Sequence, residues 1–206
     1  MKKFDAYLFD FDGTLFDSRE SLLPVWRYAF KKAGIDNVSE EQCEEFSHHP
    51  LKYAADQTGV KDYDAFYDSI TEGLELEETI KATKMFPDTV SVIATLFSRA
   101  LPLGIVSSNV STHIERVLKD KDMAKYFSVL SCSDLYSAPK PNPEPCLYGL
   151  ERMGLSPSKS ICLVGDSLQD FECAKNAGVT GILLDRDGKY KDFQGLKIAS
   201  LYELVF

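Results

Sequence analysis

Two aspartates with one residue between them, Asp10 and Asp12, directly follow a short apolar run. In an extended backbone this spacing places both carboxylates on one face, with Phe9 and Phe11 on the other. Two carboxylates held so close repel each other unless a cation lies between them or one is protonated. Gly13 comes next and permits a sharp turn at the same place. These residue types therefore indicate a cation site at the end of a strand.

A turn that merely ends a strand also favours Asp and Gly, so the interpretation depends on other polar segments. Ser107, Ser108 and Asn109 follow a second apolar run. Thr112 and Glu115 then have the spacing of a capping box, which predicts the start of a helix. Ser107 would lie at a strand end, beside backbone N–H groups suited to an anion. A plain cap or turn residue is the other interpretation of Ser107.

A single lysine, Lys140, lies between Pro139 and Pro141. The two prolines restrict the backbone on both sides of it, so its ammonium group can be delivered to a fixed position. Pro143 or Pro145 is well placed to open a helix. Most exposed lysines are only solvated, and that remains the alternative for Lys140.

A further apolar run, residues 161–164, ends at Gly165 and is followed by Asp166. A carboxylate at the carboxyl tip of a buried strand points into the crevice where open α/β sheets bind ligands. Ser167 can cap the next helix, and Asp170 lies in its first turn, where a carboxylate interacts favourably with the helix dipole. Helix capping alone is the alternative role for Asp170.

Together these segments resemble the haloacid dehalogenase superfamily of phosphatases. Residues 10–14 match its first motif, Ser107 the second, Lys140 the third, and residues 165–167 with Asp170 the fourth. The resemblance extends from Phe4 to Gly178. It implies hydrolysis of a small-molecule phosphate monoester with Mg²⁺ as cofactor. The continuation after Thr14 is similar to the phosphoglycolate-phosphatase-like branch, whose members have a helical cap.

The resemblance implies a role for each carboxylate. Asp10 would attack the phosphorus and form an aspartyl-phosphate, and Asp12 would act as general acid and then as general base. Mg²⁺ would be held by Asp10, by the backbone carbonyl of Asp12 and by Asp166, with Asp170 supporting it through water.

The remaining motif residues would bind the transferred group. Thr14, Ser107, Ser108 and Asn109 would hold phosphoryl oxygens, and Lys140 would neutralise charge on both the nucleophile and the phosphoryl group.

Three other functions are considered. A dehalogenase shares the nucleophile but needs neither Mg²⁺ nor an acid two residues on, so Asp12 and Asp166 argue against it. A sugar phosphomutase of the same superfamily has the same four motifs and stays open. A non-catalytic binding module would usually lack a site carboxylate, and here all are present.

The elements that must position these residues form an α/β fold: a doubly wound parallel sheet of Rossmann type with an inserted helical cap. We expect strands at 4–10, 103–107, 127–131, 161–165 and 181–184, with crossover helices at 89–99 and after Pro143. Residues 1–16 and 85–206 would form the catalytic core and residues 17–84 the cap. The segment 17–84 has eight Lys or Arg against fifteen Asp or Glu, and this shift in charge supports the boundary.

The segment 17–84 has helical periodicity, with helices expected at 21–33, from Ser39, and at 51–58, 63–73 and 77–84. The turn from Ser47 to Lys52 would reach the crevice, where His48, His49 and Lys52 could read the leaving group. A surface turn whose histidines contact only water is the alternative. This segment and Asp88, where the family often has glycine, differ from the usual pattern and leave the substrate open. Phosphoglycolate, a nucleotide, a sugar phosphate and pyrophosphate are all candidates.

Composition limits the partners. The chain has 206 residues with 44% hydrophobic residues and a net charge of −9, which argues against nucleic-acid and anionic-membrane partners. There is no apolar run of membrane-spanning length and no signal-peptide pattern. Five cysteines without a Cys-x-x-Cys motif are typical of reduced thiols, so a cytoplasmic monomer or weak dimer is expected.

Overall fold

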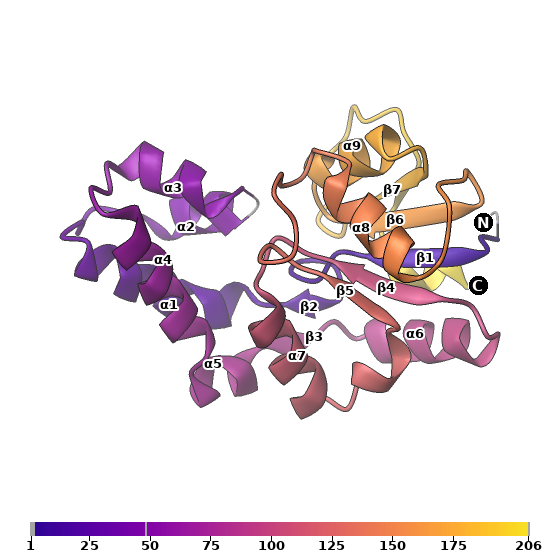
Figure 1. The fold of residues 1–206 in the computed structure, drawn as a ribbon, viewed down its shortest axis with the longest axis horizontal. Coiled ribbons are helices and arrows are strands. Elements are labelled where there is room, and N and C mark those ends of the chain that lie inside the picture. The colour runs from indigo at the N-terminus through magenta and orange to yellow at the C-terminus, as the bar shows by residue number, and fades with distance from the viewer. Residues whose placement is uncertain (1–2, 48, 206) are drawn as a thin grey trace.

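The computed structural model describes residues 3–47 and 49–205. It contains a parallel six-stranded sheet in the order β5-β4-β1-β6-β7-β8. Figure 1 shows this sheet and its helices on one side of the molecule and a group of helices on the other. The strands of the sheet are β1 (Ala6–Phe9), β4 (Leu103–Val106), β5 (Val129–Ser131), β6 (Ile161–Gly165), β7 (Thr180–Leu184) and β8 (Lys197–Ile198).

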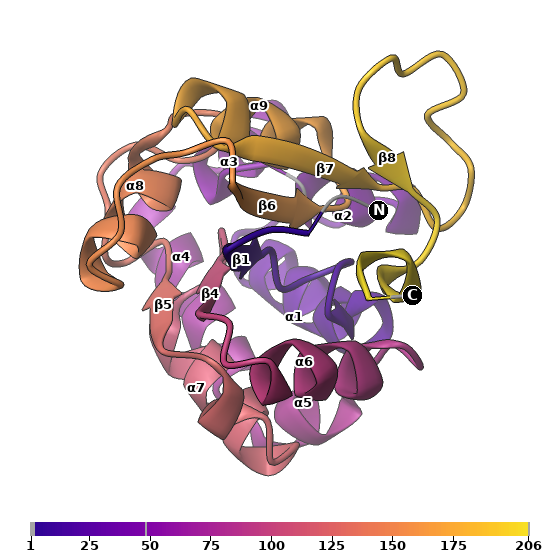
Figure 2. The same cartoon turned by 90° about the vertical axis from the view of Figure 1, so that its right-hand side faces the viewer.

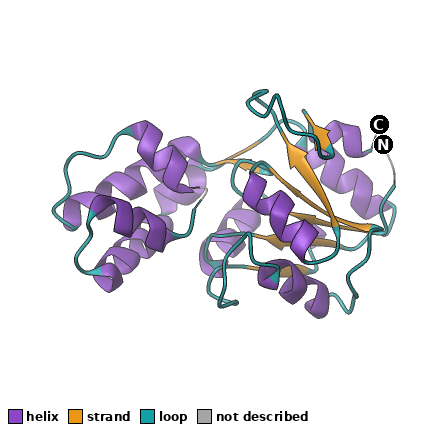
Figure 3. Cartoon of the chain, turned by 90° about the horizontal axis from the view of Figure 1, so that it is seen from above, coloured by secondary structure: helices purple, strands orange, loops and turns teal. Residues whose placement is uncertain are grey.

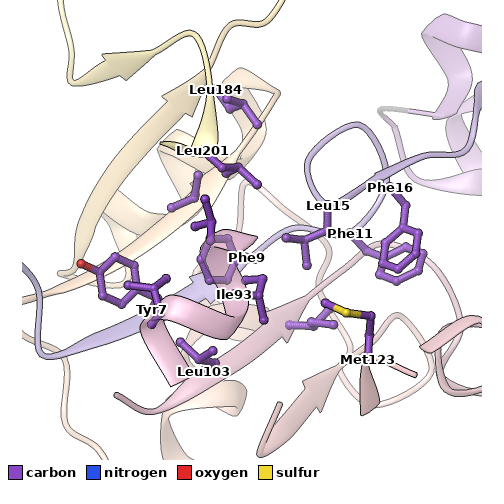
Figure 4. Close-up of a cluster of buried hydrophobic side chains, with 14 of the residues drawn as sticks. Tyr7, Phe9, Phe11, Leu15, Phe16, Ile93, Leu103, Met123, Leu184 and Leu201 are labelled. Carbon is purple, nitrogen blue, oxygen red and sulfur yellow. The ribbon is translucent and has the colours of Figure 1, made fainter. Parts of the chain in front are cut away.

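Alternate side chains of the central strand β1 enter two different hydrophobic clusters. Tyr7 and Phe9 belong to one cluster, and Ala6 and Leu8 belong to the other. All four are buried, as expected for a parallel strand covered on both faces. Figure 4 shows the first cluster, in which Phe11 lies among the core side chains. The predicted separation of Phe9 and Phe11 from the paired aspartates is therefore supported by the packing of the two rings.

Helices cover both faces of the sheet, as Figure 2 shows. One face packs against α6 (Thr89–Ser98), α7 (Ser111–Asp120), η1 (Ala124–Tyr126) and η2 (Leu201–Leu204). The other packs against α8 (Glu144–Arg152) and α9 (Leu168–Asn176). The chain is thus an α/β protein with a doubly wound parallel sheet, as the sequence predicts.

Residues 18–83, which we call the helical lobe, lie between two short strands, β2 (Phe16–Asp17) and β3 (Lys84–Met85). These strands pair antiparallel, Phe16 with Met85 and Asp17 with Lys84, and Figure 3 shows them joining the lobe to the rest. The division into a catalytic core and a cap at residues 17–84 stays a prediction. The helices of the lobe are α1 (Arg19–Lys32), α2 (Glu40–Ser47), α3 (Leu51–Thr58), α4 (Tyr63–Leu74) and α5 (Glu77–Ala82).

The lobe has a hydrophobic cluster of its own, centred on aromatic rings. Phe30 lies 5.8 Å from Trp26 and 5.0 Å from Phe66, measured between ring centroids. Phe46 of α2 packs on the same group at 6.0 Å from Phe30. Aromatic contacts of this kind add to the stabilisation from burial, so the helices of the lobe hold one another in place.

Most expected elements are confirmed within one to three residues, but the sequence missed the short strands β2, β3 and β8. The helix expected to end at Lys84 ends at Ala82, because Lys84 pairs in β3. The Ser39 capping box is present: the Gln42 N–H donates to Ser39 Oγ, and the Ser39 N–H donates to Gln42 Oε1.

The capping box at Thr112 and Glu115 is wrong. The helix begins at Ser111, and the distant Asp134 accepts from the Ser111 N–H at 2.8 Å and from Ser111 Oγ at 2.5 Å. Asp134 therefore caps the N-terminus of the helix, the role that the local pattern predicts for Thr112.

Across the described ranges 3–47 and 49–205, none of the helices has the length and apolar character that crossing a bilayer requires.

Candidate active site

The predicted motif residues converge at the carboxyl ends of the three central strands. Asp10 follows β1 directly, Ser107 follows β4 and Asp166 follows β6. Because β1 is hydrogen-bonded to β4 on one side and β6 on the other, their carboxyl ends lie next to each other. The sheet therefore assembles residues that are far apart in the sequence at a single edge.

Lys140 is buried at the centre of this edge. Its Nζ donates to Asp10 Oδ1 at 2.7 Å, to Asp170 Oδ1 at 2.5 Å and to the Val106 carbonyl at 3.3 Å. The Lys140 side chain is 5% exposed, so the interpretation as a merely solvated lysine is wrong. All three donor positions of the ammonium group are used within the site.

Three carboxylates meet beside Lys140. Oxygens of Asp10, Asp166 and Asp170 lie within 4.8 Å of one another, a spacing suited to a bound cation. Asp170 also accepts from the Ser167 hydroxyl at 2.5 Å and the Ser167 N–H at 3.2 Å, completing a capping box at the start of α9. Asp170 thus caps the helix and holds Lys140 as well, so helix capping is only part of its role.

Two glycines allow the carboxylates to approach so closely. Gly13 has φ +78°, and a Cβ there would come within 2.2 Å of an Asp166 oxygen. A Cβ at Gly165 would come within 2.2 Å of the Asp170 carboxyl carbon. Any side chain at these positions would displace a carboxylate of the cluster.

The electrostatics of the cluster fit a cation. Burial raises the pKa of Asp10 well above its ordinary value, although Lys140 acts in the opposite direction. Burial, together with the charge of Asp170, raises the pKa of Asp166 to about 7. Burial opposes the charge on Lys140, but Asp10 and Asp170 keep its pKa well above the ordinary value. Asp10 and Asp170 thus share the Lys140 ammonium group, and the charges of Lys189 and Lys140 act on Asp166 against the effect of burial. A divalent cation would supply further positive charge.

Asp12 is not one of the three clustered carboxylates. Its Oδ2 accepts from Asn109 Nδ2 at 3.1 Å, so Asn109 orients it. Asp12 Oδ1 and Thr14 Oγ1 are buried and have no hydrogen-bond partner within the described ranges. Buried polar atoms usually have partners, so both atoms are available to a ligand.

Ser107, Ser108 and Asn109 form the loop between β4 and α7. The Asn109 N–H donates to Ser107 Oγ at 3.1 Å, which holds the loop in a tight turn. Tyr136 donates its hydroxyl to the Ser107 carbonyl at 2.9 Å. Sequence reasoning missed Tyr136, which lies in the long segment before Lys140 and has no motif around it.

Sequence reasoning also missed Arg186, which follows β7. Its guanidinium group donates to both oxygens of Asp88, at 2.9 and 3.0 Å, and to the Thr14 carbonyl at 2.9 Å. The guanidinium carbon lies 4.0 Å from the centroid of the Phe86 ring. Asp88, one of the departures from the family pattern, therefore fixes an arginine that supports the motif turn at Thr14.

The crevice between the sheet edge and the helical lobe contains two cavities. The larger, of about 260 Å³, extends from Gly13 and Asp166 toward Arg186 and Lys189. The smaller, of about 100 Å³, extends from Ser108 and Asn109 toward α3 and α4. Four residues line both cavities: Asp12, Leu22, Trp26 and Ser47.

The predicted specificity residues of the lobe have different positions. His49 lines the smaller cavity and accepts at Nδ1 from Gln169 Nε2 at 2.9 Å, so it connects the lobe to α9. Lys52 is exposed, pairs with Asp56 and lines neither cavity. His48 lies outside the described residues, and the roles of all three in specificity stay predictions.

Helix α7 connects the loop of Ser107, Ser108 and Asn109 to the far side of the lobe. The buried His113 donates from Nδ1 to the Leu74 carbonyl at 2.8 Å. One turn later Arg116 donates to Glu75 Oε2 at 2.7 Å, and Lys121 donates to the Lys81 carbonyl at 3.1 Å. The lobe is thus held by α7 on one side and by Gln169 on the other.

Comparison with known proteins agrees with this geometry. Residues 7–184 match the family model described as haloacid dehalogenase-like hydrolase. The chain is 32% identical to the "Putative pyrophosphatase PpaX" of Clostridium perfringens, over 84% of this chain and 80% of that protein. It is 27% identical to the phosphoglycolate phosphatase of Escherichia coli strain K12, over 88% and 82% respectively.

A solved structure has the same fold. The "Putative haloacid dehalogenase-like hydrolase" from Bacteroides fragilis superimposes with a TM-score of 0.89 and 23% identity, over 98% of this chain and 100% of that one. At this level of identity the superposition establishes the fold alone.

Proposed function

The chain belongs to the haloacid dehalogenase-like hydrolase family, and on that premise we propose that it is a Mg²⁺-dependent phosphatase. It would hydrolyse a small-molecule phosphate monoester through an aspartyl-phosphate. The observation that carries the proposal is the buried Lys140 between Asp10 and Asp170, with three carboxylates within 4.8 Å of one another. The negative charges of this cluster exceed its positive charge, and a bound phosphate dianion would increase that excess.

In the first half of the reaction, the Asp10 carboxylate attacks phosphorus, an oxygen–phosphorus bond forms and the ester bond to the alcohol breaks. Asp12, oriented by Asn109 at 3.1 Å, gives a proton to the departing oxygen. Lys140 holds Asp10 in place and offsets the negative charge.

In the second half, water attacks phosphorus in the aspartyl-phosphate, and its proton goes to Asp12. Inorganic phosphate leaves and the Asp10 carboxylate is restored. Acid–base help of this kind contributes about 10²–10⁴-fold to such rates. Asp12 therefore serves both halves and returns to its starting state.

The site residues fit the proposed metal. Asp10, the backbone carbonyl of Asp12 and Asp166 would hold Mg²⁺, and Asp170 would support it through water. The metal would offset charge on the phosphoryl oxygens. Thr14, Ser107, Ser108 and Asn109 would bind those oxygens, and the unpartnered Thr14 hydroxyl supports this role.

We further propose residues 1–16 and 85–206 as the catalytic core and residues 17–84 as its cap. The relatives' names support placement in the phosphoglycolate-phosphatase-like branch. We also propose a monomer or weak dimer in the cytoplasm, a reducing compartment in which the five free cysteines would stay reduced.

The test is release of inorganic phosphate from 4-nitrophenyl phosphate with Mg²⁺, then with excess EDTA, then after Mg²⁺ is restored. We expect activity to disappear with EDTA and to return with Mg²⁺. Undiminished activity in EDTA would overturn the metal assignment. Conversion of a sugar phosphate without net phosphate release would instead establish a phosphomutase.

A further inference from the structure

We propose that the substrate is a phosphate monoester of an uncharged alcohol with an apolar face, and not an ester with a second carboxylate or phosphate. The inference rests on the proposed phosphatase function and concerns the side of the site that receives the alcohol. It follows from which residues line the two cavities next to Asp12.

The alcohol must occupy these cavities. A general acid has to be within hydrogen-bond reach of the oxygen that it protonates, so the leaving oxygen lies beside Asp12. Asp12 lines both cavities, and so do Leu22 and Trp26 of α1. An alcohol attached to that oxygen therefore contacts an apolar wall formed by these two side chains.

The smaller cavity offers no full positive charge. Within the described part of the chain, no lysine or arginine lines it. Its titratable groups besides Asp12 are the phenol of Tyr67 and His49, whose Nδ1 is already hydrogen-bonded to Gln169. Most of the wall is apolar, including Val25, Phe46, Leu51, Tyr67, Ile70 and Val110. An anionic group placed here would lose its hydration without gaining a partner.

The larger cavity has cations, but two of the three are already used. Arg19 donates to both oxygens of Asp17, at 2.9 and 3.0 Å. Arg186 donates to both oxygens of Asp88 and to the Thr14 carbonyl. The third, Lys189, lies over the Tyr190 ring, and its charge acts to lower the pKa of Asp166 against the effect of burial. Each guanidinium charge is thus matched by a carboxylate of the protein, although Arg19 uses only Nε and Nη2, and Arg186 Nε has no hydrogen-bond partner within the described ranges.

Acidic groups outnumber these cations. Four carboxylates beyond the catalytic ones line the larger cavity: Glu20, Glu40, Glu44 and Asp187. Glu20 pairs with Lys84 and Glu40 with Arg27, so Glu44 and Asp187 are the carboxylates that oppose the charge of Lys189. The larger cavity therefore has no net positive charge with which to attract a second anion.

This substrate class differs from those in the names of the two relatives. Phosphoglycolate carries a carboxylate on its alcohol, and pyrophosphate carries a second phosphate. Lys189 is the residue through which such a group would have to be recognised here, so it provides the sharpest opposing test.

The first experiment uses the unaltered enzyme with Mg²⁺ and two pairs of phosphate compounds, each with one member that carries a second anionic group. Phosphoglycolate is compared with 2-hydroxyethyl phosphate, which has a hydroxymethyl group in place of the carboxylate. Pyrophosphate is compared with phenyl phosphate. We expect kcat/KM to be at least tenfold higher for the uncharged member of each pair. A ratio of one or less in either pair would overturn the inference.

The second experiment changes the charge of the cavities. Ser47 lines both of them and is half-buried, so Ser47→Lys introduces a cation, and Ser47→Gln is the uncharged control of similar length. Lysine should shift the phosphoglycolate to 2-hydroxyethyl phosphate ratio at least tenfold toward phosphoglycolate, and glutamine should not. Equal ratios in the two variants would contradict the inference.

The third experiment tests the opposing assignment. Lys189→Met should change the phosphoglycolate rate less than threefold, like Lys191→Met in the same loop. A tenfold loss specific to Lys189→Met would show that Lys189 binds a substrate anion and would overturn the inference.

Failure of the proposed function gives a different result. If no ester, 4-nitrophenyl phosphate included, releases phosphate with Mg²⁺, both the proposed function and this inference are wrong. If phosphate is released but the charged esters are preferred, only this inference is wrong.

Discussion

Two buried ion-pair clusters lie on either side of the motif turn, and their chemistry differs. In the first, Lys140 is shared between Asp10 and Asp170, and the pKa of Asp10 is raised. In the second, Asp88 accepts two bonds from Arg186, one from Ser200 Oγ at 2.7 Å and one from the Leu201 N–H at 2.9 Å. Burial alone would raise the pKa of Asp88, but Arg186 and Ser200 hold it below its ordinary value.

The difference distinguishes a binding cluster from a supporting one. The charge of Asp88 is matched by Arg186, and both of its carboxylate oxygens already accept hydrogen bonds. The Lys140 cluster has more carboxylates than positive charges, and its balance needs an external cation. Both clusters are buried, so burial does not distinguish the binding role from the supporting role. The balance of charge within each cluster does.

The largest effect should come from removing the nucleophile. Asp10→Asn keeps the shape of the carboxylate but cannot form the phosphoenzyme, so kcat should fall at least about 10³-fold. Phosphate release and labelling of the denatured protein with ³²P check this. Asp88→Asn, the matched change in the other cluster, should keep the phosphoenzyme. Near-normal turnover by Asp10→Asn would place the nucleophile elsewhere.

Lys140→Ala should have the next largest effect, because it leaves Asp10 and Asp170 without their shared cation. We expect a loss in kcat of roughly 10²–10³-fold, the range seen when one electrostatic partner is removed from a reacting centre. The exposed Lys61 is the control, and Lys61→Ala should change kcat less than twofold. Similar small losses in the two variants would return Lys140 to an ordinary structural role.

Asp88→Ala should reverse the pattern and affect stability more than chemistry. It leaves Arg186, whose side chain is 18% exposed, without its carboxylate. The free energy of unfolding should fall by about 2–4 kcal/mol, near the lower end for a broken buried pair. Urea denaturation measures it. The folded fraction should keep kcat within tenfold of the wild-type value. A more than tenfold loss of kcat with an unchanged free energy of unfolding would contradict the supporting role of Asp88.

The two clusters should also respond to pH with opposite sign. The pKa of Asp166 is raised to about 7, so without metal the folded state holds an extra proton between about pH 4 and pH 7. Its contribution to stability is present below the ordinary pKa of about 4 and declines as pH rises toward 7. The lowered pKa of Asp88 gives a contribution present above pH 4 and lost as pH falls below it.

Thermal unfolding in EDTA from about pH 2 to pH 8 measures this difference. Asp166→Asn should flatten the decline between pH 5 and pH 7, and Asp88→Asn should leave that decline unchanged while removing part of the loss in acid. Mg²⁺ should raise the unfolding temperature more at pH 8 than at pH 5, since it competes with the proton. Identical pH profiles in the wild type and Asp166→Asn would show that Asp166 is not perturbed.

The smallest effect should come from the lobe side of the crevice. His49→Ala removes one neutral hydrogen bond to Gln169, worth about 1 kcal/mol, and should lower kcat/KM by two- to fivefold. Gln169→Ala should do the same and the double variant no more. Lys52→Ala, on the exposed side of α3, should leave kcat/KM unchanged. An equal loss in Lys52→Ala would show that the turn acts through surface charge.

The sequence predicts well which edge of the sheet brings the motif residues together, because each motif residue is close to a strand end. Asp10, Ser107 and Asp166 follow strands that are recognisable as buried apolar runs, and parallel strands bring their carboxyl ends together. The position of Asp170 follows from the capping pattern of one helix. Local patterns suffice for these residues, because the sheet supplies the long-range order.

Residues that depend on distant partners could not be predicted in this way. Arg186 binds Asp88 across 98 positions of sequence, and no motif connects them. Asp134 replaces the expected local cap of α7 from 23 positions away. In both cases a tertiary contact supplies what a local pattern cannot encode.

Helix α7 begins immediately after the loop of Ser107, Ser108 and Asn109, and its far side is bonded to the lobe through His113 and Arg116. An anion bound by this loop would therefore contact the residues that precede α7, and the same helix makes the contacts that hold the lobe. We expect affinity for inorganic phosphate and docking of the lobe to be linked, each strengthening the other by the same factor. The affinity for inorganic phosphate would then report on the docking equilibrium of the lobe.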